Sequence, residues 1–199
     1  MAWARRAPDW GEDACARTMR EVDRRWFLPP SVRDDADLDE PLPIGSGATN
    51  SQPSTVIAML RLLDVRAGMS CLDVGAGSGW TTALLRDLVG ARGTVLGVEL
   101  EPTLVRFGNE NLVAAGVGAR IVLAKGGFGW PAGAPYDRIL VSAMAEALPD
   151  ELVEQLAVGG VMVIPVDGWM LRVVRAAEGV RITKHGRYRF VTLRPVSPG

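Results

Sequence analysis

Three glycines within five residues constrain the fold of this chain more than any other feature. They occur in the run Asp73-Val-Gly-Ala-Gly-Ser-Gly79, which lies between an apolar segment at residues 69–74 and an amphipathic segment at residues 80–89. Glycine has no Cβ, so its backbone turns sharply and approaches a ligand closely. The run therefore predicts a strand, a tight turn and a helix, with the turn at the sheet edge where such folds bind cofactors.

Short apolar runs alternate with amphipathic stretches through the rest of the chain. We expect strands at residues 69–74, 94–99, 121–124, 138–142 and 161–166, and helices at 80–89, from Pro102 onward and at about 149–156. Pro102 suits the first turn of a helix, because the N–H that it lacks is unpaired there in any case. This alternation predicts an α/β, Rossmann-like fold with a mainly parallel sheet, helices on both faces and a C-terminal antiparallel strand.

The two ends of the chain depart from that alternation. A helix is expected at residues 13–27 and a loop-rich passage at 31–53, whereas residues 171–176 and 188–193 resemble a closing pair of strands. A length of 199 residues suits one domain. We therefore expect a single domain over residues 1–199, in which segment 1–53 covers the site and residues 54–199 form the core.

Charge and hydropathy exclude several classes of protein. The chain has 22 Lys and Arg against 23 Asp and Glu, a net charge of −1, which argues against coating nucleic acid through a basic surface. The longest apolar run, residues 158–166, contains two glycines and a proline and is far shorter than the ~20 residues that span a bilayer. The first ten residues lack the apolar stretch of a signal peptide. A soluble, cytoplasmic protein without nucleic-acid or membrane partners is expected, and a monomer is the default.

Cysteine and histidine are scarce. Cys15 and Cys71 are too few for a disulfide framework, and His185 is the one histidine. A site built from several histidines is therefore excluded, and no metal is expected.

The spacing of the glycine run distinguishes two ligand classes. A dinucleotide fingerprint needs its third glycine where this chain has Trp80, which disfavours a pyrophosphate. The next predicted strand ends in Glu99, placed to accept hydrogen bonds from ribose hydroxyls. With Asp73 before the loop, the pattern resembles the S-adenosyl-L-methionine (AdoMet) loop of class I methyltransferases, and a carboxylate there suits a ligand with an ammonium group. The alternative is a tight turn that binds nothing.

A second motif lies upstream of the glycines. Residues 41–53, PLPIGSGATNSQP, resemble the signature of the protein-L-isoaspartate O-methyltransferase family. Residues 19–29, Gly129-Trp-Pro131 and Arg189-Phe-Val191 resemble other landmarks of that family. The T-x-SQP passage joined to the glycine loop at this distance is a specific signal, whereas either motif alone is weaker.

The resemblance implies an AdoMet-dependent carboxyl methyltransferase that releases S-adenosyl-L-homocysteine and repairs L-isoaspartyl residues of damaged proteins. It assigns to the Ser51 hydroxyl the role of orienting the acceptor carboxylate; an N-cap of the helix near Pro53 is the structural alternative. The cofactor-binding residues expected are Thr49, Asn50, Asp73, Gly75, Ala76, Gly77, Ser78, Gly79, Glu99, Leu100, Lys125 and Gly126. The substrate-binding residues expected are Ile44, Ser46, Ala48 and Ser51.

That chemistry agrees with the scarcity of histidine. A carboxylate with an ordinary pKa of about 4 is already ionised at neutral pH, so its methylation needs no general base. The protein has only to hold the oxygen in line with the methyl group and exclude water, which is catalysis by positioning. The methyl ester then collapses to a succinimide, whose hydrolysis returns some normal aspartate.

The chain departs from the family pattern around both ligands. Ser46, Ala48 and Asn50 replace larger or different residues near the acceptor, and Lys125 stands where the family carries an Asp beside the adenine amino group. Lysine accepts no hydrogen bond, so cofactor binding is expected to persist but weaken, by about 1 kcal/mol.

These departures leave two further hypotheses open. One is a methyltransferase that forms an aspartimide at a specific Asp of a ribosomally made peptide, motivated by the altered pocket and by the Arg-rich stretch after Leu171. The other is a non-catalytic AdoMet-binding module, for which Lys125 is the main support.

Overall fold

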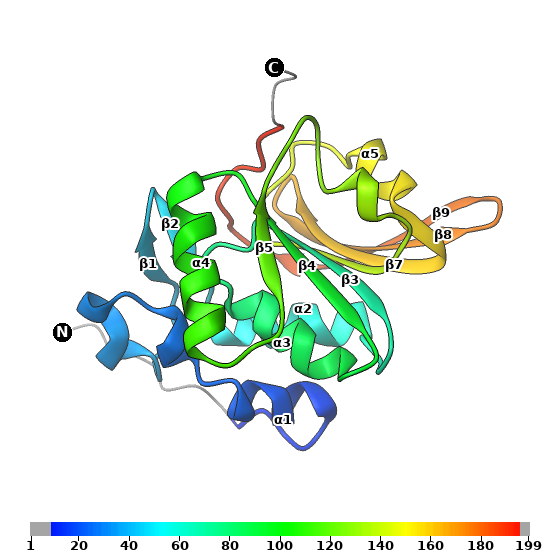
Figure 1. Cartoon of the computed structure of the whole chain (residues 1–199). Helices are drawn as coiled ribbons and strands as arrows, with labels where there is room; N and C mark the ends of the chain where they lie inside the picture. The colour runs from blue at the N-terminus through cyan, green and yellow to red at the C-terminus, as the bar shows by residue number, and fades with distance from the viewer. Residues whose placement is uncertain (1–8, 196–199) are drawn as a thin grey trace.

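A computed structural model describes residues 9–195 and contains a seven-stranded sheet with the order β5-β4-β3-β6-β7-β8-β9 (Figure 1). Its strands are β3 (Ser70–Val74), β4 (Thr94–Glu99), β5 (Arg120–Leu123), β6 (Tyr136–Val141), β7 (Leu156–Val166), β8 (Trp169–Ala176) and β9 (Gly179–Arg187). The first five in space are parallel, and β8 and β9 are antiparallel to their neighbours. The mainly parallel sheet predicted from the sequence is confirmed.

The glycine run lies where the strand order reverses. β3 pairs with β4 on one side and with β6 on the other, so the crossovers leave it in opposite directions. The loops that follow such a strand diverge and leave a crevice at the carboxyl edge of the sheet, where the parallel strands end. The residues that follow β3 therefore border the crevice of this fold.

Helices cover the two faces of the sheet unequally. The helices are α1 (Ala14–Glu21), α2 (Pro53–Leu63), α3 (Trp80–Val89), α4 (Pro102–Ala114) and α5 (Asp150–Glu154). On one face, α1, α2 and α3 lie together, below the sheet in Figure 1, and pack over Cys71 and Leu140. The opposite face buries Leu72 and Ile139 with α5 and nearby loops. Adjacent residues of one strand thus enter two cores, as the pleat of a strand requires.

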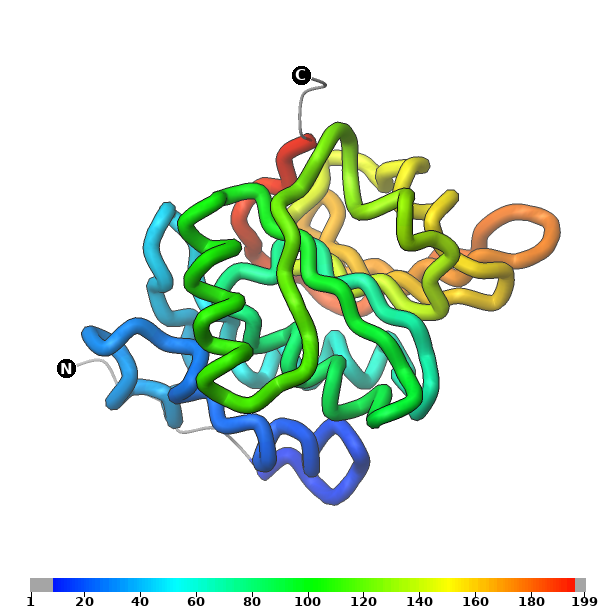
Figure 2. Tube along the Cα trace, viewed as in Figure 1, coloured from blue at the N-terminus to red at the C-terminus, as the bar shows by residue number. Residues whose placement is uncertain are grey.

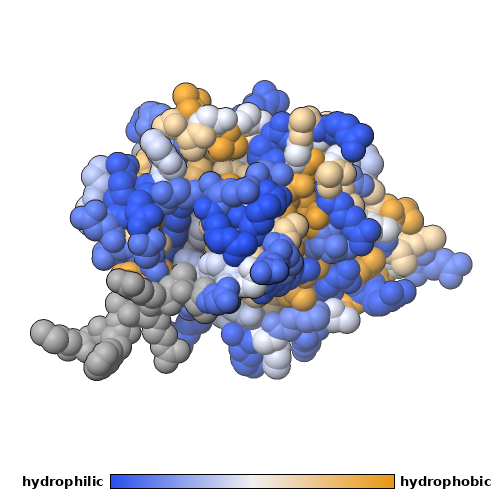
Figure 3. All heavy atoms as spheres, turned by 90° about the horizontal axis from the view of Figure 1, so that it is seen from below, coloured by the Kyte–Doolittle hydropathy of each residue, from blue (hydrophilic) through white to orange (hydrophobic). Residues whose placement is uncertain are grey.

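The surface on the α1 side is largely hydrophilic when the molecule is seen from below (Figure 3). Within the described residues, no helix has the length and apolar character needed to cross a membrane.

The N-terminal segment contains more structure than the sequence predicts. The expected helix at 13–27 stops at Glu21, because the Asp23 carboxylate accepts the Arg25 N–H at 2.9 Å and starts a separate 3-10 turn, Arg24–Phe27. The passage at 31–53, expected to be loops, includes a 3-10 turn at Pro30–Asp35. It also forms a small antiparallel pair, β1 (Leu42–Gly45) with β2 (Ala48–Asn50).

The prediction for the C-terminal end of the sheet is wrong about which residues form the last strand. β8 does pair with a closing strand, but that strand is β9, not residues 188–193, so two antiparallel strands end the sheet instead of one. The segment after β9 turns back to the carboxyl edge (Figure 2). There the Met144 N–H donates to the Val191 carbonyl and the Leu193 N–H donates to the Met144 carbonyl, both at 2.7 Å. The predicted helix at 149–156 shortens to α5, because the chain enters β7 at Leu156.

The start of α2 is capped from a distant residue. The N-cap position is Gln52, which makes no capping hydrogen bond, and the alternative of Ser51 as the N-cap is wrong. Instead the Asp39 carboxylate accepts the Ser54 N–H at 2.8 Å and the Gln52 side-chain amide at 3.1 Å. Asp39 thereby satisfies one of the unpaired amides that every helix has in its first turn.

We predict that Asp39→Ala lowers the free energy of unfolding by about 1 kcal/mol, because it leaves this helix amide without an acceptor. Urea denaturation measures the change. Asp34→Ala is the matched control: Asp34 is exposed in the same segment, and its loss is expected to cost less than about 0.5 kcal/mol. Equal losses in the two variants would contradict the capping role.

Candidate functional site

The glycine loop between β3 and α3 adopts a backbone that other residues resist. Gly75, Gly77 and Gly79 have φ angles of +79°, +52° and +90°. A Cβ at Gly79 would lie 3.0 Å from the Gly108 carbonyl oxygen, and one at Gly77 would lie 3.1 Å from the Ile44 side chain. The loop is therefore packed closely from behind. Its amides are mostly paired within the protein: the Gly75 and Ala76 N–H groups donate to the Val98 carbonyl, and the Gly79 N–H donates to the Ala76 carbonyl.

The Glu99 carboxylate, at the end of β4, holds this loop in place. Its Oε2 accepts the Gly77 N–H at 2.9 Å, and its Oε1 accepts the N–H groups of Leu100 and Glu101 at 2.6 and 3.0 Å. The side chain is nearly buried, yet it lines the pocket described below. One carboxylate thus ties two neighbouring loops together and leaves lone-pair capacity for a ligand.

Asp73 lies beneath the loop and is fully buried. Its Oδ2 accepts the hydroxyls of Thr81 and Thr82 at 2.7 and 2.6 Å, whereas Oδ1 has no hydrogen-bond partner among residues 9–195. Burial raises the pKa of Asp73 to about 6; the hydroxyls of Thr82 and Thr81 lower it, and the charge of Glu99 raises it. A buried acceptor without a donor is rare in folded proteins, and this one lies directly beneath the glycine loop.

A pocket of about 390 Å³ opens above the loop, within the size range of small-molecule sites. Six segments line it: residues 46–51, the turn after β3 with the start of α3, residues 98–101 with Leu104, Ala124 with residues 127–129, Ser142 with Ala143, and the C-terminal residues 191–194. The Arg194 guanidinium bonds Glu101 at 2.7 Å across the rim. Parts of the chain separated by more than a hundred residues therefore enclose one cavity.

The structure brings most of the predicted site residues to this wall. The lining includes Ser46, Ala48, Thr49, Asn50, Ser51, Gly75, Ala76, Gly77, Ser78, Glu99 and Leu100. Asp73 and Gly79 support the loop from below, and Ile44 packs behind Gly77. Lys125 and Gly126 are exposed and lie outside the lining, whereas their neighbours Ala124 and Gly127 belong to it.

Ser51 lies where this pocket meets a second cavity. The smaller cavity, of about 80 Å³, shares Thr49, Ser51, Ser142 and Val191 with the larger one. The Ser51 side chain is half-buried and makes no hydrogen bond to any other residue between 9 and 195. Its hydroxyl is thus free to serve a group that spans the junction.

Three parts of the wall escaped sequence reasoning. Ser142 follows β6 and lines the pocket. Residues directly after a parallel strand lie at the edge of the sheet where ligands bind, so its position in the sequence could have indicated this. Phe128 lines the pocket because its N–H donates to Glu151 at 2.8 Å and its carbonyl accepts from Gln155 at 2.8 Å, contacts to α5 that no local pattern reveals. Residues 191–194 line the pocket, whereas the sequence predicts a sheet strand over residues 188–193.

Comparison with known proteins identifies the architecture. The family described as protein-L-isoaspartate(D-aspartate) O-methyltransferase (PCMT) matches residues 5–196. This chain belongs to that family. A protein-L-isoaspartate O-methyltransferase from Methanopyrus kandleri is 42% identical over 186 residues, which cover 89% of this chain and 82% of the relative. One from Aeropyrum pernix is 46% identical over 173 residues, covering 86% and 65%.

Solved structures agree with the sequence match. A protein-L-isoaspartate O-methyltransferase structure has a TM-score of 0.83 at 24% identity, and the match covers 92% of this chain and 62% of that one, which shows the fold. A PCMT structure from Plasmodium falciparum, in complex with S-adenosyl-L-homocysteine, has a TM-score of 0.80 at 25% identity, with 92% and 91% covered. Membership of the PCMT family confirms the methyltransferase fold, the AdoMet cofactor and the isoaspartyl methyltransferase reaction that the sequence predicts.

The pocket fits AdoMet on its own geometry. Its volume suits a nucleoside-sized ligand, its glycine turn has no side chains at three positions to keep a ligand from the backbone, and Glu99 reaches its wall. The unpaired Oδ1 of Asp73 lacks a donor at the same loop, and AdoMet carries an ammonium group. Among residues 9–195, no three His, Cys, Asp or Glu side chains gather as a metal site would require.

The buried carboxyl predicts a pH dependence of stability. The folded protein binds the Asp73 proton more tightly than the unfolded chain, since the pKa rises from 3.8 to about 6. Its contribution is therefore fully present below pH 3.8 and is lost as the pH rises through about 6.

We predict that between about pH 4 and pH 7 the wild type loses about 2 kcal/mol of unfolding free energy relative to Asp73→Asn, which does not ionise there. Urea denaturation of both proteins at the two pH values measures the difference. A difference independent of pH would contradict the raised pKa.

Proposed function

We propose that this chain transfers the methyl group of AdoMet to the free carboxylate of L-isoaspartyl residues in proteins and peptides, and that Ser51 orients that carboxylate. The observation that carries the proposal is the position of Ser51 at the junction of the two cavities. The larger cavity would hold the cofactor and the smaller one the peptide end of the substrate.

For this reaction the protein has mainly to position the two reactants. AdoMet supplies an electrophilic methyl group on a sulfonium sulfur. The carboxylate oxygen forms a new C–O bond as the C–S bond breaks, and the electron pair of that bond stays on sulfur as S-adenosyl-L-homocysteine leaves. No proton moves in this step, so the site requires no general base.

The residues at the junction suit an anionic acceptor. The Ser51 hydroxyl donates one hydrogen bond to a carboxylate oxygen, which directs the other oxygen toward the methyl group. Thr49 and Ser142 place two more hydroxyls on the wall that both cavities share. Val191 and Leu193, held to Met144, cover the site and reduce the access of water.

The roles of the cofactor-binding residues are part of the same proposal. Glu99 would accept the ribose hydroxyls, the Gly75–Gly79 turn would contact the amino-acid end, and Asp73 would favour its ammonium group from below. Contacts of the cofactor with Lys125 and Gly126 remain predictions, because both lie outside the lining.

We also infer that residues 1–199 act as one methyltransferase domain, in which the described part of segment 1–53, residues 9–53, packs over the core. The contacts of Asp39 with the start of α2 support this inference. A monomer in the cytoplasm remains a prediction.

We predict that the purified protein transfers labelled methyl from AdoMet to an isoaspartyl peptide and at least about tenfold less to the matching aspartyl peptide. Absence of transfer to the isoaspartyl peptide would overturn the proposal. Equal transfer to both would overturn the acceptor assignment.

Ser51→Ala is expected to lower kcat on the isoaspartyl peptide by about tenfold or more, because the acceptor loses a positioning hydrogen bond. Ser54→Ala is the matched control, since Ser54 contributes only its backbone N–H to the contacts seen and lines neither cavity. Undiminished turnover in Ser51→Ala would remove the positioning role.

Lys125→Asp is expected to tighten S-adenosyl-L-homocysteine binding a few-fold, about 1 kcal/mol, because it supplies an acceptor near the predicted adenine end. Calorimetry measures the dissociation constant. Arg92→Asp makes the same charge change in the exposed turn before β4, at the opposite edge of the sheet. Equal tightening in both variants would indicate a general charge effect.

A further inference from the structure

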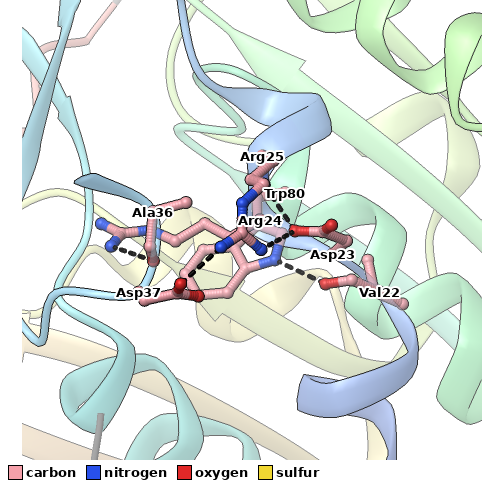
Figure 4. Close-up of polar contacts among 7 residues, drawn as sticks. All are labelled: Val22, Asp23, Arg24, Arg25, Ala36, Asp37 and Trp80. Carbon is pink, nitrogen blue, oxygen red and sulfur yellow. Dashed lines mark hydrogen bonds and ion pairs between the residues drawn. The ribbon is translucent and has the colours of Figure 1, made fainter. Parts of the chain in front are cut away.

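Arg24 is a buried arginine at the back of the acceptor site. Its side chain is 5% exposed and lies over the Trp80 ring, 5.2 Å from the ring centroid (Figure 4). Among the described residues it forms no ion pair with a carboxylate. Burial lowers the pKa of the Arg24 guanidinium to about 10, and Asp39 opposes that shift, so the group stays charged at neutral pH.

Every donor of this guanidinium meets an acceptor. Nε donates to the Asn50 side-chain oxygen at 2.7 Å. The two terminal nitrogens donate to the carbonyls of Ala36, Leu38, Glu40, Asn50 and Ser51, at 2.9 to 3.3 Å. A guanidinium alone among side chains offers five N–H groups in a rigid fork.

The contacts converge on the junction between β2 and α2. Three of the six accepting oxygens belong to Asn50 and Ser51, and the Ser51 carbonyl is 3.0 Å from Nη2. The Asn50 amide also donates to the Ser78 hydroxyl at 3.1 Å, in the glycine loop. One side chain is therefore linked to both the acceptor segment and the cofactor loop.

We infer that Arg24 is a positioning residue for methyl transfer: its fork fixes the backbone of Asn50 and Ser51 so that the Ser51 hydroxyl meets the acceptor carboxylate at the junction of the cavities. The inference rests on the proposed function. Burying a charged side chain costs free energy, which its hydrogen bonds must offset. An apolar residue at this position would form no hydrogen bonds to these carbonyls and would leave the backbone of Asn50 and Ser51 less firmly held. Catalysis by positioning is sensitive to small displacements of the group that orients the substrate.

A double-mutant cycle tests whether Arg24 acts through Ser51. Methyl transfer to the isoaspartyl peptide is measured at saturating AdoMet for the wild type, Arg24→Lys, Ser51→Ala and the double variant. We expect Arg24→Lys, which keeps the charge but loses the fork, to lower kcat by about tenfold. In the Ser51→Ala background the same change is expected to lower kcat by less than about twofold, because the hydroxyl that it positions is absent.

A purely structural role predicts a different result. Loss of stability or a general loosening would lower kcat by the same factor in both backgrounds, and this outcome would overturn the inference, as would a folded Arg24→Lys with unchanged kcat. The dissociation constant of S-adenosyl-L-homocysteine is expected to change by less than about threefold, since Arg24 does not line the cofactor pocket.

Arg25→Lys is the matched control. Arg25 is the next residue, but it forms ion pairs with Asp23 and Asp37 on the surface (Figure 4). Its hydrogen bonds among the described residues go to the same two carboxylates, and none goes to Asn50 or Ser51. Its substitution is expected to leave kcat within about twofold of the wild type. A loss equal to that of Arg24→Lys would overturn the inference.

Asn50→Ala provides a second route if Arg24→Lys does not fold. This variant keeps the arginine and removes the acceptor of Nε, which loosens the same junction. Because the Asn50 amide also donates to Ser78 in the cofactor loop, kcat is compared at saturating AdoMet in both backgrounds. It is expected to lower kcat in the wild type but not in the Ser51→Ala background, and equal effects in both would contradict the positioning role. A wild type without isoaspartyl methylation would instead refute the proposed function, so the two failures are distinguishable.

Discussion

Two carboxylates at the ends of adjacent strands hold the glycine loop on which the rest of this site depends. Glu99 accepts the Gly77 amide from the side, and Asp73 binds the threonine hydroxyls of α3 from below. The turn has positive φ angles that only glycine adopts at little cost, and its back is packed against Ile44 and Gly108. Because the loop is fixed, the crevice beside β3, where the strand order changes direction, has a definite shape.

The remaining walls of the pocket come from segments outside the sheet. The N-terminal segment reaches the crevice through β2, where Arg24 gathers its carbonyls and Asp39 caps α2. The C-terminal segment closes the other side through its bonds to Met144. These contacts are polar and long-range, and through them the described segments before α2 and after β9 line the pocket instead of extending the sheet.

A pocket built from a glycine loop and two covering segments agrees with the reaction of the PCMT family. A carboxylate acceptor arrives ionised, and the fold therefore provides hydroxyls, a cofactor loop and cover in place of a base. The family pattern is kept at Ser51 and at the glycines, whereas Lys125 departs from it at a position that the structure leaves exposed. A change at the rim alters affinity more readily than it alters the transfer step.

Local pattern determined much of this protein from the sequence alone. Residues 80–89 and 94–99 were predicted with the bounds observed for α3 and β4, because apolar periodicity and glycine punctuation are local signals. The motifs around Ser51 and Gly75 are also local patterns, and they predicted residues that line the pocket. Only the tertiary structure decided the end of α1 at Glu21, the pairing of β8 with β9, the turn of residues 191–194 over the pocket, and the burial of Arg24. Each of these depends on carbonyls, amides and carboxylates far apart in the chain, and their pairing is settled by where the folded backbone brings them.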